Sequence, residues 1–200
     1  LATRVGTFTK APFLLIDLEL KGGGAGHVLG FTFIPLGLKV IPLLLDELLT
    51  TVKGRPITFG EMASLHDAGQ RKLTHLGHEG AAMMALSMFD MALHDAFARA
   101  AGEPLYKLLG GKAQQLPTYN SCGLGLMALA EVAREARELV AEHGGFSHVK
   151  LRMGRGEIAG EVAAYHAARE AIGPAIEISC DFNQGLDPAR ALETCRAIDG

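Results

Sequence analysis

The sequence predicts an α/β fold class with two parts, an α+β region over residues 1–111 and a parallel α/β region over residues 112–200. Two apolar segments, 11–20 and 27–33, flank the glycine-rich stretch "KGGGAG", a pattern typical of a β-hairpin. After the boundary, strand-like and helix-like segments alternate three times, which favours parallel strands joined by helical crossovers. The pair Gly110–Gly111 marks the boundary between the two parts.

In the first part, helical segments follow the hairpin. Residues 36–52 have a helical pattern, in which Pro42 marks a kink or a helix start. A long helix rich in Ala, Met and Leu is predicted from Glu79 to Ala101, where "GEP" ends it. The stretch "LYKLLGG" predicts a short helical turn closed by the glycine pair. We therefore expect antiparallel strands packed against helices.

The second part contains three predicted strand–helix units. The strands are expected in "PTYNSCG", "FSHVKLRM" and "AIEISCDF". The helices that follow them are expected in "ALAEVAREARELVAEHG", "EIAGEVAAYHAAREAIG" and "DPARALETCRAI", the last with Asp187 as its N-cap. Three such units predict three parallel strands in one sheet.

Composition excludes several classes of partner. The net charge is −3 with acids and bases interspersed, so neither nucleic acid nor an anionic membrane surface is expected to bind. The most apolar stretch, residues 31–49, is interrupted by prolines and charged residues and cannot span a bilayer. Three cysteines without CxxC spacing argue against disulfides or a zinc knuckle and favour a cytoplasmic location.

Polar side chains stand at the C-terminal end of each predicted strand, which is where parallel α/β folds place their ligand sites. Because side chains alternate across a strand, each end contributes two residues to one face. These pairs are Tyr119 and Ser121, Lys150 and Arg152, and Asp181 and Asn183. Any one of these residues alone is as readily explained as part of a solvated loop. Together they predict a site for an anion, because two cations are costly to bury without one.

The same stretches resemble those of a known family. "VKLRMG" and "DFNQGLD" resemble the ends of the second and third barrel strands in the mandelate racemase / muconate lactonizing enzyme family of the enolase superfamily, and "TYNSCGL" resembles the first. "APFLLIDLELKGGGAGHVLGF" and "SMFDMALHDAFARAAGEPLYKLLGG" resemble its capping domain. The resemblance spans essentially the whole chain. It implies an enolase-type capping domain over residues 1–111 and the first three βα units of a TIM-type barrel over residues 112–200, since a complete barrel needs about 250 residues.

The resemblance also implies an activity, namely Mg²⁺-dependent abstraction of the proton α to a carboxylate through an ene-diolate. It implies that Asp181 is a metal ligand, that Lys150 neutralises the substrate carboxylate, and that Asn183, Ser121 and Tyr119 contact the substrate. The other metal ligands and the general base are expected beyond Gly200, so this segment alone should be inactive. The expected partners are a 2-hydroxy acid or acid sugar and further copies of the chain.

Arg152 departs from the family pattern, which has a second catalytic lysine, the general base, at this position. An arginine, with a pKa above about 12, stays protonated, whereas it can clamp a carboxylate or a hydroxylated substrate with two hydrogen bonds. The sequence therefore favours a 2,3-dihydroxy acid (acid-sugar) dehydratase. A mandelate-type 2-hydroxy acid racemase and a catalytically inactive relative are the alternatives.

An alternative of another class is an NADP-binding α/β domain. "GLGLMA" matches the GxGxxA dinucleotide fingerprint, and Lys150 and Arg152 could then meet a 2′-phosphate. The preceding "PTYNS" is, however, too polar for the buried first strand that this fingerprint requires.

Overall fold

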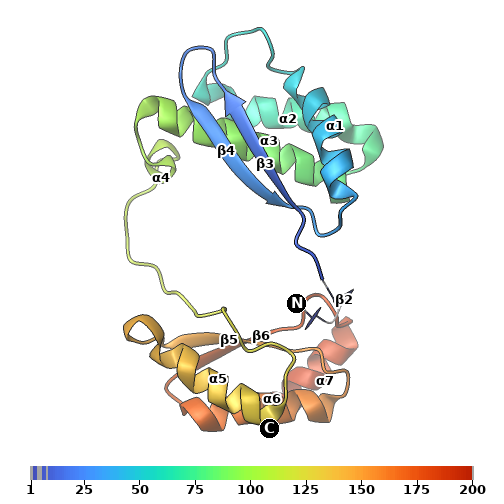
Figure 1. The fold of residues 1–200 in the computed structure, drawn as a ribbon, viewed down its shortest axis with the longest axis vertical. Coiled ribbons are helices and arrows are strands. Elements are labelled where there is room, and N and C mark those ends of the chain that lie inside the picture. The colour runs from blue at the N-terminus through green and yellow to red at the C-terminus, as the bar shows by residue number, and fades with distance from the viewer. Residues whose placement is uncertain (1, 4–5, 8, 200) are drawn as a thin grey trace. The chain divides into compact units, whose positions relative to one another are not determined.

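The computed structural model describes residues 2–3, 6–7 and 9–199, and the chain divides into two compact units (Figure 1). Lys10–Gln114 forms one, here called the N-terminal unit. Gln115–Gly200 and Leu1–Thr9 form the other, the C-terminal unit. Each has its own cluster of buried apolar side chains. The short strands β1 (Ala2–Thr3) and β2 (Gly6–Thr7) pair with each other.

The N-terminal unit contains the predicted hairpin. Strands β3 (Phe13–Glu19) and β4 (Ala25–Phe31) pair antiparallel without a bulge, from Phe13 opposite Phe31 to Glu19 opposite Ala25. Gly23 and Gly24 both have positive φ, 100° and 95°, in the turn that joins the strands, a conformation that glycine adopts without strain. The hairpin prediction is confirmed.

Helices cover one face of this hairpin (Figure 1). The N-terminal unit contains α1 (Gly37–Leu49), α2 (Met62–Leu73), α3 (Gly80–Ala101) and α4 (Leu105–Leu108), with 3₁₀ turns at Phe59–Glu61 and Thr74–Leu76. Helix α3 lies so close to β4 that a Cβ at Gly26 would overlap the main chain at Ala92. Pro42 lies inside α1 and does not begin it.

The C-terminal unit is built on a parallel pair of strands. Strands β5 (His148–Arg152) and β6 (Glu177–Asp181) are joined through α6 (Ile158–Ile172) and are paired from His148 opposite Glu177 to Arg152 opposite Asp181. Helices α5 (Leu129–Ala141) and α7 (Pro188–Asp199) precede and follow them, and the 3₁₀ turn Glu142–Gly144 extends α5. The main-chain N–H of Arg190 donates to Asp187 Oδ1 at 2.8 Å, as expected of an N-cap.

The prediction of a first strand over residues 117–123 of this unit is wrong. In the stretch 117–123 only Asn120 pairs, in a single parallel bridge with Val149. Its side chain donates to the main-chain oxygen of Leu139 and to Glu142 Oε2, and accepts from the N–H of Cys122 at 3.0 Å. These bonds turn the chain away from strand geometry after one residue, so the described residues form two parallel strands and a bridge instead of three strands.

Alternation along β5 decides which side chains face the core. Val149, Leu151 and Met153 are fully buried against the helices. Lys150 and Arg152 therefore point to the opposite face of the strand. In β6, Cys180 lies on the helix side, where burial raises the pKa of its thiol to about 11. None of the described helices is long and apolar enough to cross a membrane.

Candidate active site at the strand ends

A carboxylate and a lysine meet at the C-terminal ends of β5 and β6. Lys150 Nζ lies 3.4 Å from Asp181 Oδ2, and the two side chains are 22% and 29% exposed. The pKa of Asp181 is below its ordinary value, first because the main-chain N–H of Asn183 donates to Asp181 Oδ1 at 2.8 Å. The nearby charges of Lys150 and Arg152 lower the pKa further. Asp181 is therefore held ionised at neutral pH.

Asn183 presents an oxygen that has no partner. Its Oδ1 is buried and accepts no hydrogen bond from any residue that the structure describes. Asn183 and Gln184 both have positive φ, 48° and 59°, and such a conformation costs energy in residues other than glycine. An orphaned, buried acceptor next to an ionised carboxylate is a place where a ligand that donates a hydrogen bond, or a cation, would be stabilised.

These oxygens are of the type that Mg²⁺ prefers, since it binds carboxylate and amide oxygens and keeps several waters. The fit is partial. Within the described ranges no group of three or more His, Cys, Asp or Glu side chains could hold a metal ion. Asp181 and Asn183 can thus contribute to a magnesium site but would hold the ion weakly by themselves.

Arg152 of β5 is the register partner of Asp181 on the neighbouring strand β6. Its side chain is half-buried, and no ion pair joins it to a carboxylate in the described part of the chain. Its main-chain N–H donates to the oxygen of Leu124 at 2.9 Å, which ties the end of β5 to the loop that precedes α5. The site therefore holds a second positive charge that is only partly balanced by Asp181.

Tyr119 reaches the site although it is not in a strand. Its ring centre lies 5.8 Å from Lys150 Nζ and 5.2 Å from the ring centre of His148. Ser121 is exposed, and no described contact joins it to Lys150 or Asp181. The structure thus brings together five of the six predicted site residues and leaves Ser121 at the margin.

His148 is a further residue beside the site. His148 lies on the same face as Lys150, one step further into the sheet, and its Nε2 is 2.7 Å from Ser179 Oγ. Ser179 is the register partner of Lys150, so this hydrogen bond lies directly beside Lys150 on the same face of the sheet. Alternation along β5 places His148 on this face already from the sequence, but the contact with Ser179 depends on the pairing of β5 with β6.

Comparison with known proteins identifies the family. The model described as "Mandelate racemase / muconate lactonizing enzyme, N-terminal domain" matches residues 1–110, and "Enolase C-terminal domain-like" matches residues 131–200. The chain belongs to the mandelate racemase / muconate lactonizing enzyme family. The resemblance noted in the sequence is thereby confirmed, as part of the enolase superfamily.

Two characterised relatives of this family member have different activities. An L-Ala-D/L-Glu epimerase of Bacillus subtilis is 28% identical over 72% of the chain and 38% of its own length. An L-talarate/galactarate dehydratase of Salmonella typhimurium is 32% identical over 62% of the chain and 31% of its own length. Epimerases and dehydratases thus occur among relatives at similar identity.

Two solved structures superpose over nearly the whole chain. An enolase from an alpha proteobacterium, BAL199, with bound magnesium, is 38% identical with a TM-score of 0.87, covering 99% of this chain and 54% of that one. An enolase from Bradyrhizobium, complexed with magnesium and mandelic acid, is 32% identical with a TM-score of 0.85, covering 98% and 53%. The chain therefore spans about half the length of these relatives.

The dinucleotide alternative finds no support in this family member. The stretch 123–128 follows a single bridge residue instead of a buried strand. The main-chain N–H of Leu124 already donates to Glu135 Oε2 at 2.5 Å. A phosphate at this loop would meet a carboxylate where the fingerprint requires free N–H groups.

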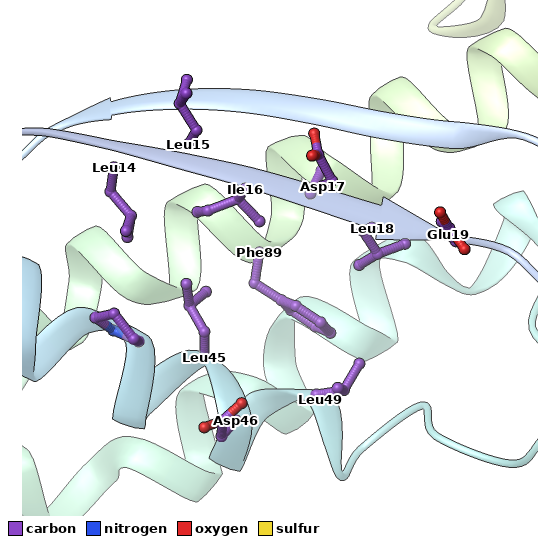
Figure 2. A pocket seen from close by; sticks show the side chains of 12 residues that line it. Leu14, Leu15, Ile16, Asp17, Leu18, Glu19, Leu45, Asp46, Leu49 and Phe89 are labelled. Carbon is purple, nitrogen blue, oxygen red and sulfur yellow. The ribbon is translucent and has the colours of Figure 1, made fainter.

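The N-terminal unit contains a cavity of a different character, with a volume of about 430 Å³. Figure 2 shows Leu14, Ile16 and Leu18 pointing from β3 toward Phe89 and the apolar side of α1. The charged residues that line it are all acidic, Asp17, Glu19 and Asp46, and no lysine, arginine or histidine does so. Such a lining disfavours a carboxylate ligand in this cavity. We assign the candidate site to the strand ends of the C-terminal unit because Lys150, Arg152 and Asp181 meet there.

Proposed function

We propose that the complete protein removes the proton α to the carboxylate of a small acid, and that its reaction is the dehydration of an acid sugar. The observation that carries the proposal is the convergence of Lys150, Arg152 and an ionised Asp181 at one edge of the sheet. It is supported by a dehydratase among the relatives and by solved relatives with magnesium. On this view residues 1–111 are the capping domain and residues 112–200 begin the barrel.

In this proposal Lys150 neutralises the substrate carboxylate. Its ammonium group lies half-buried between the Tyr119 ring and Asp181, where an ionic contact is worth more than in water. A positive charge fixed at the carboxylate lowers the cost of the negative charge that develops when the α proton leaves. Tyr119 and Ser121 are proposed to contact the rest of the substrate.

Asp181 and Asn183 supply oxygen atoms on the other side of the site. Asp181 would contribute a carboxylate ligand to Mg²⁺, while the orphaned Asn183 Oδ1 would accept a hydrogen bond from a substrate hydroxyl. Mg²⁺, when bound, supplies a Lewis acid that polarises the substrate carboxylate and offsets its growing charge.

Arg152 favours dehydration over racemisation. A racemase needs a base on each face of the α carbon, and a guanidinium cannot give up its proton near neutral pH. Held beside Asp181, it can instead donate two hydrogen bonds to a carboxylate or to vicinal hydroxyls. An elimination needs only one base, so a permanently protonated Arg152 is compatible with it.

The test is a panel of acids given to the full-length protein with Mg²⁺ in D₂O. We expect one configuration of a 2,3-dihydroxy acid to lose water, and exchange of the α proton to be confined to that configuration. Proton NMR reports both exchange and product. Racemisation of a 2-hydroxy acid with exchange in both enantiomers would overturn the dehydratase proposal, and no exchange with any acid would indicate a catalytically inactive relative.

The 200-residue segment should neither bind Mg²⁺ tightly nor turn over substrate. Within its described residues Asp181 is not part of any metal-binding group of three or more side chains, so several ligand positions would remain with water. Titration calorimetry with Mg²⁺ should show no saturable heat at micromolar concentration. Micromolar affinity would mean that the segment holds a metal site other than the one described.

A further inference from the structure

The loop between β5 and α6, residues 153–157, is anchored by a buried carboxylate. The main-chain N–H groups of Gly154 and Gly156 donate to the Glu161 carboxylate at 3.0 and 3.2 Å. Glu161 is 4% exposed, and a carboxylate is stable at that depth only if hydrogen bonds compensate for the lost water. Arg190 of α7 holds the same loop from another side by donating to the oxygen of Gly156 at 2.8 Å.

Arg155 connects this loop to the one before it. Its Nη1 donates to the oxygen of Arg152 at 3.2 Å, and its Nη2 to the oxygens of Met127 at 3.3 Å and Gly125 at 3.5 Å. The guanidinium therefore spans the end of β5 and the segment that leads into α5. Burial lowers the pKa of Arg155, and the negative charge of Glu161 opposes that effect.

The hydrogen bonds of Glu161 and those of Arg155 both hold main-chain segments next to the candidate site. These segments adjoin the end of β5. There the main-chain N–H of Arg152 donates to the main-chain oxygen of Leu124, and that of Met153 to the main-chain oxygen of Asp181, each at 2.9 Å. A shift of the 153–157 loop would therefore move Arg152 relative to Asp181. Displacements of about 1 Å at a distance from the reacting atoms can cost about a hundredfold in rate.

We propose that Arg155 and Glu161 are positioning residues of the site, which hold the β5–α6 loop so that Lys150 and Arg152 stay in register with Asp181. Neither is proposed to touch the substrate. The inference rests on the proposed function for its catalytic consequence, whereas the joining of the two loops can be tested without activity. Lysine should replace Arg155 only in part, because one ammonium group lacks the planar fork that reaches two segments.

The chain offers a matched control. The side chain of Arg169 also donates to main-chain oxygens, in this case from Nη1 to those of Gly173 at 2.7 Å and Ile176 at 2.5 Å. These lie before β6 begins, at the end of the strand opposite to Asp181. Arg155→Met and Arg169→Met each remove a half-buried guanidinium that donates to main-chain oxygens. Arg169 also lies 5.7 Å from the Tyr165 ring centre, so Arg169→Met should lower the melting temperature at least as much as Arg155→Met.

The experiment compares these variants in the full-length protein. Hydrogen exchange of residues 121–127 and 150–154 should be at least about tenfold faster in Arg155→Met and unchanged in Arg169→Met. With an active acid, kcat should fall about ten- to a hundredfold in Arg155→Met, with KM altered much less, and stay within about twofold in Arg169→Met. Arg155→Lys should recover part of the loss. Glu161→Gln, which keeps the side-chain shape, should show faster exchange at 153–157 and a similar fall in kcat.

Unchanged exchange at 121–127 in Arg155→Met would overturn the proposal, whatever the activity. So would a wild-type kcat in both Arg155→Met and Glu161→Gln, because the residues would then be structural only. If Arg155→Met does not fold, Glu161→Gln decides alone, and unchanged exchange at 153–157 or a wild-type kcat in that variant would overturn the proposal. A wild-type protein that acts on no acid would refute the proposed function, and the exchange rates would still show whether Arg155 joins the two loops.

Discussion

The Lys150→Met substitution should lower kcat/KM of the full-length protein by about 10²–10³-fold, the usual effect of removing one group that stabilises developing charge. Methionine keeps the length of the side chain but leaves Asp181 without the ammonium 3.4 Å away. Steady-state kinetics with the acid that the wild-type protein uses would measure the loss.

Lys107→Met is the control for that experiment. Lys107 also pairs with a carboxylate, Glu103 at 3.1 Å, but both side chains are about half exposed and lie in the N-terminal unit. Such surface pairs contribute about 0–1 kcal/mol to stability, so this variant should keep wild-type activity. If Lys150→Met also kept activity within about threefold, Lys150 would not be the group that meets the substrate carboxylate.

Changing Arg152 to lysine should allow proton abstraction from the second face of the substrate α carbon. The wild-type protein is expected to exchange the α proton of one configuration only, because guanidinium stays protonated. A lysine in the same half-buried place can lose its proton near neutral pH, so Arg152→Lys should exchange both configurations. KM should rise about tenfold through loss of the bidentate hydrogen bonds. Proton NMR in D₂O with each enantiomer separately would measure both effects.

Arg134→Lys controls for loss of a guanidinium elsewhere. Arg134 donates to both oxygens of Glu138, at 2.8 and 2.7 Å, on the exposed side of α5. This variant should leave the exchange pattern and KM unchanged. If the wild-type protein already exchanged both enantiomers, Arg152 would not occupy the position of a second base, and the argument for dehydration would be lost.

Several parts of the fold could be predicted from local patterns. The hairpin follows from two apolar segments around a glycine-rich turn, and β5 and β6 follow from short apolar runs between helical periods. Helix α2 was missed, because only a narrow stripe of it, Met62, Leu65, Gly69 and Leu73, is buried and its other residues are polar. In the C-terminal unit the first strand was predicted where only a single bridge forms, because the side-chain hydrogen bonds of Asn120 compete with strand pairing and cannot be read from propensity.

The sequence by itself determined which groups stand at the ends of β5 and β6 and which of them share a face. Side chains alternate with a period of two, so Lys150 and Arg152 had to leave β5 on the side opposite Val149 and Leu151. It also determined that Arg152 stays charged, since that is a property of the guanidinium and not of its surroundings.

Only the tertiary structure decided how these groups meet. The 3.4 Å contact of Lys150 with Asp181 and the hydrogen bond of Arg155 to Gly125 each join segments that are about 30 residues apart in the sequence. The burial of Asn183 Oδ1 without a described partner likewise follows from the folded loop. Such contacts depend on the register between strands and on loop conformation, which are set by packing against the helices. Local sequence patterns show on which face of a strand a side chain lies, but they do not show the register between strands or the conformation of the loops.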